Sequence, residues 1–203
     1  MATVRIGLPA AEESVRRLSA GDEVLLSGIV YTGRDRFHKH LAEGNASPVD
    51  LRGGAIYHCG PVVLRAGQGW RIVAAGPTTS ARENPYMAGI IRREGVRIVI
   101  GKGGMGEETV AACRECGCVY LQAVGGAAAS LAKCVRKVAG VRFLEEFGAT
   151  EACWALEVAD FPAMVAIDAS GRSLFAEVRA ASKTVLDGIV FGTIARRFRA
   201  NAI

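Results

Sequence analysis

Several marks of common protein classes are missing from this 203-residue sequence. It has no run of about 18 apolar residues, which a membrane-spanning helix needs, and its first residues lack the apolar core of a signal peptide. Aromatic residues make up only 6%, and the 25 lysines and arginines are scattered rather than gathered in a stripe, apart from Arg196, Arg197 and Arg199. We therefore expect a cytoplasmic protein that binds neither a membrane nor nucleic acid.

The composition is that of a folded globular protein. Apolar residues make up 50% and charged residues 22%, which argues against disorder. Because the sequence contains no internal repeat, low-complexity stretch or obvious linker, we expect a single domain over residues 1–203, in which residues 180–203 form a helical tail. The net charge of +5 is compatible with a small anionic substrate.

The six cysteines are expected to be reduced thiols in the cytoplasm. Cys113, Cys116 and Cys118 form a C-x2-C-x-C run that resembles part of a metal site. A structural zinc site needs four ligands, and there is no second C-x2-C and no nearby histidine pair. Buried, inert thiols are the favoured interpretation, with a zinc-bearing interaction module as the alternative. The remaining cysteines stand alone and are expected in the core: Cys59, Cys134 and Cys153.

Strand-like segments, glycine-rich turns and helical segments alternate along most of the chain, which is typical of α/β proteins. Asn84 is expected to cap a helix that has Pro85 at its first position. An extended arm is predicted over residues 3–8, and strands over residues 23–32, 55–60, 70–76, 96–101, 119–123, 153–158 and 163–167. Helices are predicted over residues 11–18, 34–44, 84–94, 107–116, 127–133 and 182–199.

The most informative segment is GPTTSARENPY, which begins at the end of a predicted strand. It places three hydroxyl groups, those of Thr78, Thr79 and Ser80, just ahead of Arg82. Hydroxyls and free backbone N–H groups beyond a strand's carboxyl end commonly bind anions in α/β folds, and a guanidinium group suits a carboxylate or phosphate. The alternative is that the hydroxyls merely cap the next helix. The spacing leaves both interpretations open.

Two further segments place basic residues after predicted strands. IGKGGMG sets Lys102 among glycines that allow close backbone approach, although the P-loop order is absent. TGRDRFH offers Arg34 for an anion and Asp35 or His38 to position another group, although solvated first-turn helix residues are the commoner explanation. His38 and His58 are too far apart in sequence to be paired from the sequence alone.

Five segments in order carry a resemblance to a known family: GDEVLLSGIVYTGRDRFHKHL, DLRGGAIYHCGPVV, GPTTSARENPY, GKGGMG and LQAVGGAAASLA. The chain resembles the β subunit, or equivalent C-terminal domain, of class I fumarate hydratases and the related L-tartrate dehydratases. The match covers residues 8–175 and leaves the tail outside. It implies an α/β fold: a swivelling β/β/α-type single domain with a mixed sheet and flanking helices.

The resemblance also implies a function. Members are hydro-lyases, and the first type reversibly hydrates fumarate to (S)-malate. Their α part holds a 4Fe–4S cluster with three cysteines, so this chain is expected to act only in a hetero-oligomer with an α subunit, without ligating the metal itself. The matching positions assign carboxylate binding to Arg34, Arg82 and Lys102, and the general base to Thr78.

Two alternatives remain. The matched motifs do not separate fumarate or malate from tartrate, which differs by one hydroxyl group. From a different class, a stand-alone α/β module could bind a phosphorylated ligand, with the GPTTS and GKGG turns as its anion cradle.

Overall fold

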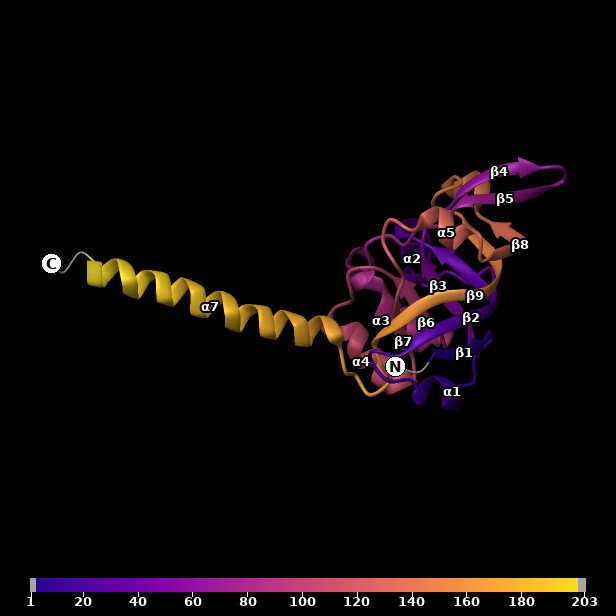
Figure 1. Ribbon diagram of the computed structural model, residues 1–203. Helices are drawn as coiled ribbons and strands as arrows, with labels where there is room; N and C mark the ends of the chain where they lie inside the picture. The colour runs from indigo at the N-terminus through magenta and orange to yellow at the C-terminus, as the bar shows by residue number, and fades with distance from the viewer. Residues whose placement is uncertain (1–2, 201–203) are drawn as a thin grey trace.

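The structure, a computed structural model, describes the backbone of residues 3–200 and the side chains of residues 3–190 (Figure 1). The strands are β1 (Thr3–Gly7), β2 (Glu23–Gly33), β3 (Ala55–His58), β4 (Val62–Ala66), β5 (Gly69–Ala74), β6 (Ile98–Gly101), β7 (Val119–Gln122), β8 (Val135–Arg142) and β9 (Cys153–Ile167). The helices are α1 (Glu12–Arg16), α2 (Asp35–Ala42), the 3-10 helix η1 (Ser80–Glu83), α3 (Asn84–Glu94), α4 (Glu107–Cys116), α5 (Ala128–Ala132), α6 (Leu144–Phe147) and α7 (Leu174–Ala200).

Five strands close into a small barrel. β2, β3, β6 and β7 are parallel neighbours, and β9 pairs antiparallel with both β7 and β2. β1 extends the sheet beside β2, and β8 extends it beside β9. This mixed sheet with flanking helices confirms the predicted α/β class.

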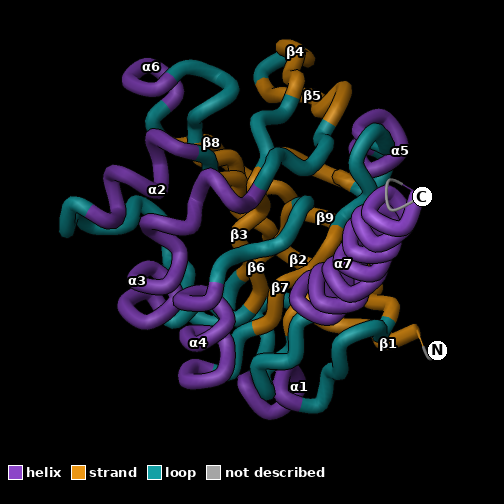
Figure 2. The backbone as a smooth tube through the Cα atoms, turned by 90° about the vertical axis from the view of Figure 1, so that its left-hand side faces the viewer, coloured by secondary structure: helices purple, strands orange, loops and turns teal. Residues whose placement is uncertain are grey.

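Alternate residues of the parallel strands face two apolar clusters. Tyr57, Ile98 and Leu121 belong to a cluster that draws on all five barrel strands and therefore fills the interior. Ile56 and Val99 point the other way, into a cluster with residues of α2, α3 and α4. Figure 2 shows these three helices along one side of the barrel. Burial on both faces explains why β3, β6 and β7 are short, largely apolar runs.

The element predictions hold for most of the chain, with three corrections. The strands predicted over residues 153–158 and 163–167 are one strand, β9, whose Asp160 has a φ of 51°. The prediction missed β4, β8 and α6. Asn84 does not cap α3, which begins at that residue; its Oδ1 instead accepts a hydrogen bond from Gly106 N–H at 2.8 Å.

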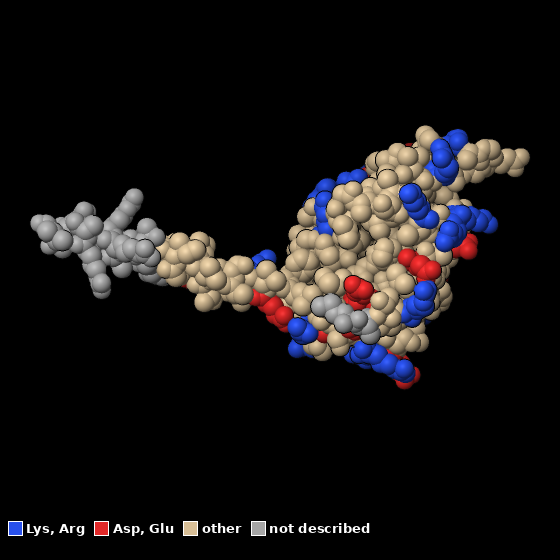
Figure 3. Space-filling model, viewed as in Figure 1, with Lys and Arg blue, Asp and Glu red and all other residues tan. Residues whose placement is uncertain are grey.

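Helix α7 leaves the barrel at its first turns and extends away from it (Figure 1). It includes the predicted tail helix of residues 182–199 but begins earlier, at Leu174. Figure 3 shows charged side chains near its base and mostly uncharged ones further along the described part. Among the described residues, no helix has both the length and the apolar character needed to cross a bilayer.

Candidate functional site

Arg34 lies at the carboxyl end of β2, where it is the N-cap residue of α2. Its side chain is partly buried and its Nε lies 3.4 Å from Oε1 of Glu151. The guanidinium group runs over Gly60, just past the end of β3, where an added Cβ would lie 2.9 Å from Arg34 Nη1. A glycine is therefore required there for Arg34 to take this position.

Thr78 and Lys102 are joined through their backbones. Lys102 N–H donates to the Thr78 carbonyl at 3.3 Å, and Ser80 N–H donates to the Lys102 carbonyl at 2.9 Å. Thr78 N–H in turn donates to the carbonyl of His58, the last residue of β3, at 2.7 Å. The GPTTS and GKGG segments thus form one short parallel bridge beside the ends of β3 and β6.

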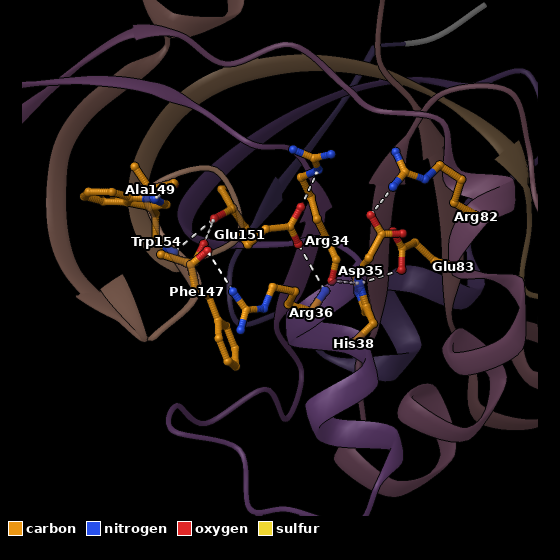
Figure 4. A network of polar contacts seen from close by, with 12 residues as sticks. Arg34, Asp35, Arg36, His38, Arg82, Glu83, Phe147, Ala149, Glu151 and Trp154 are labelled. Atoms are coloured by element: carbon orange, nitrogen blue, oxygen red, sulfur yellow. Dashed lines mark hydrogen bonds and ion pairs between the residues drawn. The ribbon is translucent and has the colours of Figure 1, made fainter. Parts of the chain in front are cut away.

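Arg82 reaches the same edge from η1. Its Nη2 donates to Oδ2 of Asp35, the residue after Arg34. Figure 4 shows the guanidinium groups of Arg34 and Arg82 on one side of the start of α2, with His38 beneath them. All four sequence-predicted residues, Arg34, Thr78, Arg82 and Lys102, follow or adjoin the carboxyl ends of neighbouring parallel strands.

The hydroxyl groups do not act as helix caps. Thr79 is the N-cap residue of η1 but makes no side-chain capping hydrogen bond. This removes the alternative explanation for the run of hydroxyls at that position. Thr78 is half-buried beside Lys102, and Thr79 is exposed.

The cations at this edge outnumber their carboxylate partners. Arg34 forms an ion pair with Glu151, and Arg82 forms one with Asp35. Lys102 has no ion-pair partner within the described residues. Its side chain instead passes Gly125, where an added Cβ would lie 3.5 Å from Lys102 Cδ. A lysine without an ion-pair partner suits a small anion.

A buried polar layer that the sequence did not reveal lies under these residues. Its members are fully or almost fully buried, and each comes from an element that carries or adjoins a predicted site residue. They are His38, His58, Ser80, Glu83 and Tyr120. The rings of His38 and His58, which could not be paired from the sequence, have centroids 5.1 Å apart.

Hydrogen bonds and charge connect this layer to the site. His38 Nδ1 lies 2.9 Å from the Arg34 carbonyl and 3.0 Å from Glu83 Oε2, although only the first contact has hydrogen-bond geometry. Burial, with a smaller effect of His38, holds the pKa of His58 well below its ordinary value, so this ring is neutral at neutral pH. Burial raises the pKa of Tyr120 to about 12, so its hydroxyl remains a donor.

A cavity of about 680 Å³ lies beside the site, between the loop after β6 and the first turns of α7. Its lining includes Met105, Arg172 and Phe175, but none of the four predicted residues. These four lie instead at the open edge of the barrel, where a second protein surface could cover them.

The cysteines do not fit an iron–sulfur cluster. Within the described residues, no three His, Cys, Asp or Glu side chains are grouped so that they could hold a metal ion. Cys113 and Cys118 are buried as predicted, whereas Cys116 and Cys134 are only partly buried, contrary to the prediction. Burial raises the pKa of the Cys118 thiol well above its ordinary value. Burial also raises the pKa of Cys59 and of Cys153 to about 12. Thiols that resist ionisation are poor metal ligands.

Comparison with known families identifies the family of this chain. The family model described as Fumarase C-terminus matches residues 1–178. The chain belongs to this family. The match ends in the first turns of α7, so the rest of that helix lies outside it.

Relatives of this fumarase C-terminus chain are named as hydro-lyases. A Geobacillus stearothermophilus protein provisionally named fumarate hydratase class I is 50% identical over 180 residues, which is 88% of this chain but 35% of that protein. The chain thus spans about a third of that relative. A protein of Methanocaldococcus jannaschii, provisionally named L(+)-tartrate dehydratase subunit beta, is 42% identical over 82% of this chain and 88% of its own length. The L(+)-tartrate dehydratase subunit beta of Escherichia coli is 36% identical over 83% of this chain and 85% of its own length.

Proposed function

We propose that this chain is the β subunit of a hydro-lyase of the class I fumarate hydratase type, which reversibly hydrates fumarate to (S)-malate. The observation that carries the proposal is that Arg34, Thr78, Arg82 and Lys102 lie at or beside the ends of neighbouring strands at one barrel edge, in a family whose named relatives add or remove water. We also propose a cytoplasmic location, because six free thiols suit a reducing compartment.

The three cations match a substrate with two carboxylates. Two of them can neutralise the dianion, and the third remains to stabilise charge that develops during the reaction. Removing a proton next to a carboxylate builds up negative charge on the substrate, and preorganised cations in a closed site stabilise such charge well. Arg34 and Arg82 would exchange Glu151 and Asp35 for the substrate carboxylates.

Thr78 is the proposed base. A threonine hydroxyl is a weak base by itself, and we propose that Lys102, whose backbone adjoins that of Thr78, stabilises its alkoxide form. The bridge between their backbones holds these two residues together before substrate arrives. In this role Thr78 would remove the proton from the substrate carbon, or return it during hydration.

The partner is proposed to be an α subunit with the 4Fe–4S cluster, because the thiols of this chain do not fit one. Bound beside this edge, the cluster would supply a Lewis acid for the substrate hydroxyl. The open position of the four residues gives such a partner access, and the complex would then be a hetero-oligomer.

A second candidate reaction is the dehydration of L-tartrate. The names of the Methanocaldococcus and Escherichia relatives favour it, whereas the name of the Geobacillus relative favours fumarate. The two substrates share the pair of carboxylates that the cations would bind, so the proposed roles of Arg34, Arg82 and Lys102 are the same for both.

The test is anaerobic assay of the complex reconstituted with an α-type chain. We expect turnover of malate and fumarate by the complex, and none by either chain alone. Preferential turnover of L-tartrate would select the second candidate. Absence of turnover with all three substrates, or tight binding of a sugar phosphate or nucleotide by the lone chain, would contradict the proposal.

A further inference from the structure

Ser80 is fully buried, yet it is the most connected residue of the polar layer under the candidate site. Its Oγ lies 2.8 Å from Nδ1 of His58 on β3 and accepts a hydrogen bond from the Tyr120 hydroxyl, on β7, at 2.9 Å. Its backbone N–H donates to the carbonyl of Lys102. One serine therefore connects the bridge of Thr78 and Lys102 to two strands of the barrel.

The space around Ser80 is shaped for its hydroxyl. At Gly101, the residue before Lys102, an added Cβ would lie 1.9 Å from Ser80 Oγ and 3.1 Å from His58 Nδ1. The strand thus ends in a glycine where the hydroxyl and the ring come closest to its backbone. Any larger residue at position 101 would displace the hydroxyl from both of its partners.

The hydrogen bonds can run in one direction, from Tyr120 to His58. The Tyr120 hydroxyl donates its proton to Ser80 Oγ, which leaves the serine proton free for another acceptor. His58 is neutral, and a neutral imidazole has one nitrogen that accepts. With Nδ1 as the acceptor, the three side chains form one series of hydrogen bonds that runs from Tyr120 through Ser80 to His58. The His58 proton is then on Nε2.

We propose that Ser80 is a positioning residue that anchors Thr78 and Lys102 to the barrel through this chain of hydrogen bonds. The inference rests on the proposed function, because Thr78 and Lys102 need to be held in place only if they act in the hydro-lyase reaction. A displacement of about 1 Å can lower an enzymatic rate by about 100-fold. Arg34 is held at the start of α2, and Arg82, although it shares η1 with Ser80, is also held by its ion pair with Asp35. Loss of the anchor should therefore lower kcat more than it raises KM.

The experiment compares Ser80→Ala, Tyr120→Phe and the double variant with Thr109→Val as a matched control. Thr109 is also buried, but its hydroxyl has no partner, so its removal tests the loss of a buried hydroxyl as such. In the complex, we expect Ser80→Ala to reduce kcat by roughly 10- to 100-fold with KM within about 3-fold. The double variant should have the same kcat as Ser80→Ala, because both changes break the same series of hydrogen bonds.

Two measurements on the lone full-length chain are independent of activity. Nitrogen-15 NMR of the histidines should show His58 protonated on Nε2, with a changed Nδ1 signal in Ser80→Ala and Tyr120→Phe. Amide hydrogen exchange at Thr78 and Lys102 should accelerate by roughly 10-fold or more in Ser80→Ala, while the strand amides of Val99 and Leu121 are unchanged.

The outcomes separate the inference from the function. An inactive wild-type complex would contradict the proposed function, and the exchange and NMR data would still decide whether Ser80 anchors the bridge. Unchanged exchange at Thr78 and Lys102 in Ser80→Ala, or a kcat equal to that of Thr109→Val, would overturn the inference. If Ser80→Ala does not fold, Tyr120→Phe supplies the same comparison, because it removes one donor and keeps Ser80 in place.

Discussion

Arg82 donates a hydrogen bond to Asp35, the residue that directly follows Arg34. This contact joins η1 to the start of α2 and so brings together two cations that are distant in sequence. The side chains of Arg82 and Asp35 are 53% and 35% exposed, and an ion pair this exposed contributes at most about 1 kcal/mol to stability. The pair is therefore better suited to holding Arg82 ready for an anion than to holding the fold together.

Arg82→Ala or Lys102→Ala should each lower kcat/KM of the reconstituted complex by about 10²–10³-fold, because each removes a charge that stabilises the transition state. Unfolding of the lone chain should be almost unchanged, because neither side chain belongs to the core. Anaerobic kinetics with malate, together with thermal unfolding, checks both statements.

Arg92→Ala is the matched control for Arg82→Ala. Arg92 also forms an exposed ion pair, with Glu115, and these side chains are 44% and 51% exposed. It lies in the last turn of α3, whereas the candidate site adjoins the first turn. We expect wild-type kinetics for this variant. Near-wild-type kinetics for both Arg82→Ala and Lys102→Ala would instead remove these residues from the site.

Gly101→Ala should destabilise the protein, because the added Cβ would overlap the Ser80 hydroxyl. Overpacking of this kind typically costs about 1–3 kcal/mol, or a fall in Tm of roughly 2–4 °C per kcal/mol in a chain of this size. Gly140→Ala in β8 is the control, since a Cβ there would meet nothing within 4 Å. Equal melting temperatures for the two variants would show that the hydroxyl has room to move.

Stability should fall as the pH drops below about 6.5. The pKa of His58 in the folded protein lies well below its ordinary value of 6.5 because the ring is buried. The unfolded chain therefore takes up a proton before the folded one does, and the free energy of unfolding decreases by at most about 1.4 kcal/mol per pH unit. Urea unfolding between pH 7.5 and 5 measures the slope. His58→Gln should have a shallower slope, and parallel curves for the two proteins would contradict this assignment.

Much of the barrel could be predicted from the sequence because its parallel strands have a local signature. β3, β6 and β7 are buried on both faces, so they are continuous apolar runs that end in glycine or polar residues. β8 was missed because none of its residues is fully buried and it contains Arg136, Lys137 and Arg142. Its strand conformation depends on pairing with β9, and such tertiary context has no local signal.

The candidate site could be predicted only in part, for a similar reason. Arg34, Arg82 and Lys102 were found because each follows a recognisable strand end or turn. The layer beneath them was not, because His58 and Ser80 are brought together by the barrel, and the hydroxyl run that marked Ser80 gave no sign that its side chain is buried beside His58. A signal was nevertheless present in Gly101, since a glycine at the end of a buried strand marks a close approach by another group.

The outer part of α7 should be dispensable for the fold. The helix is attached through Phe175, whose ring packs against Tyr120 with centroids 6.2 Å apart and covers Gly104. Beyond this point its large apolar side chains are 44–65% exposed: Val178, Val185, Leu186, Ile189 and Val190. A chain that ends after residue 180 should therefore melt within about 2 °C of the full chain, since exposed residues change stability by less than about 0.5 kcal/mol each.

Phe175→Ala in the same truncated chain should lower the melting temperature further, because it removes the attachment itself. A fall of more than about 5 °C on truncation alone would mean that the outer helix packs against the barrel, or against a second chain, in solution.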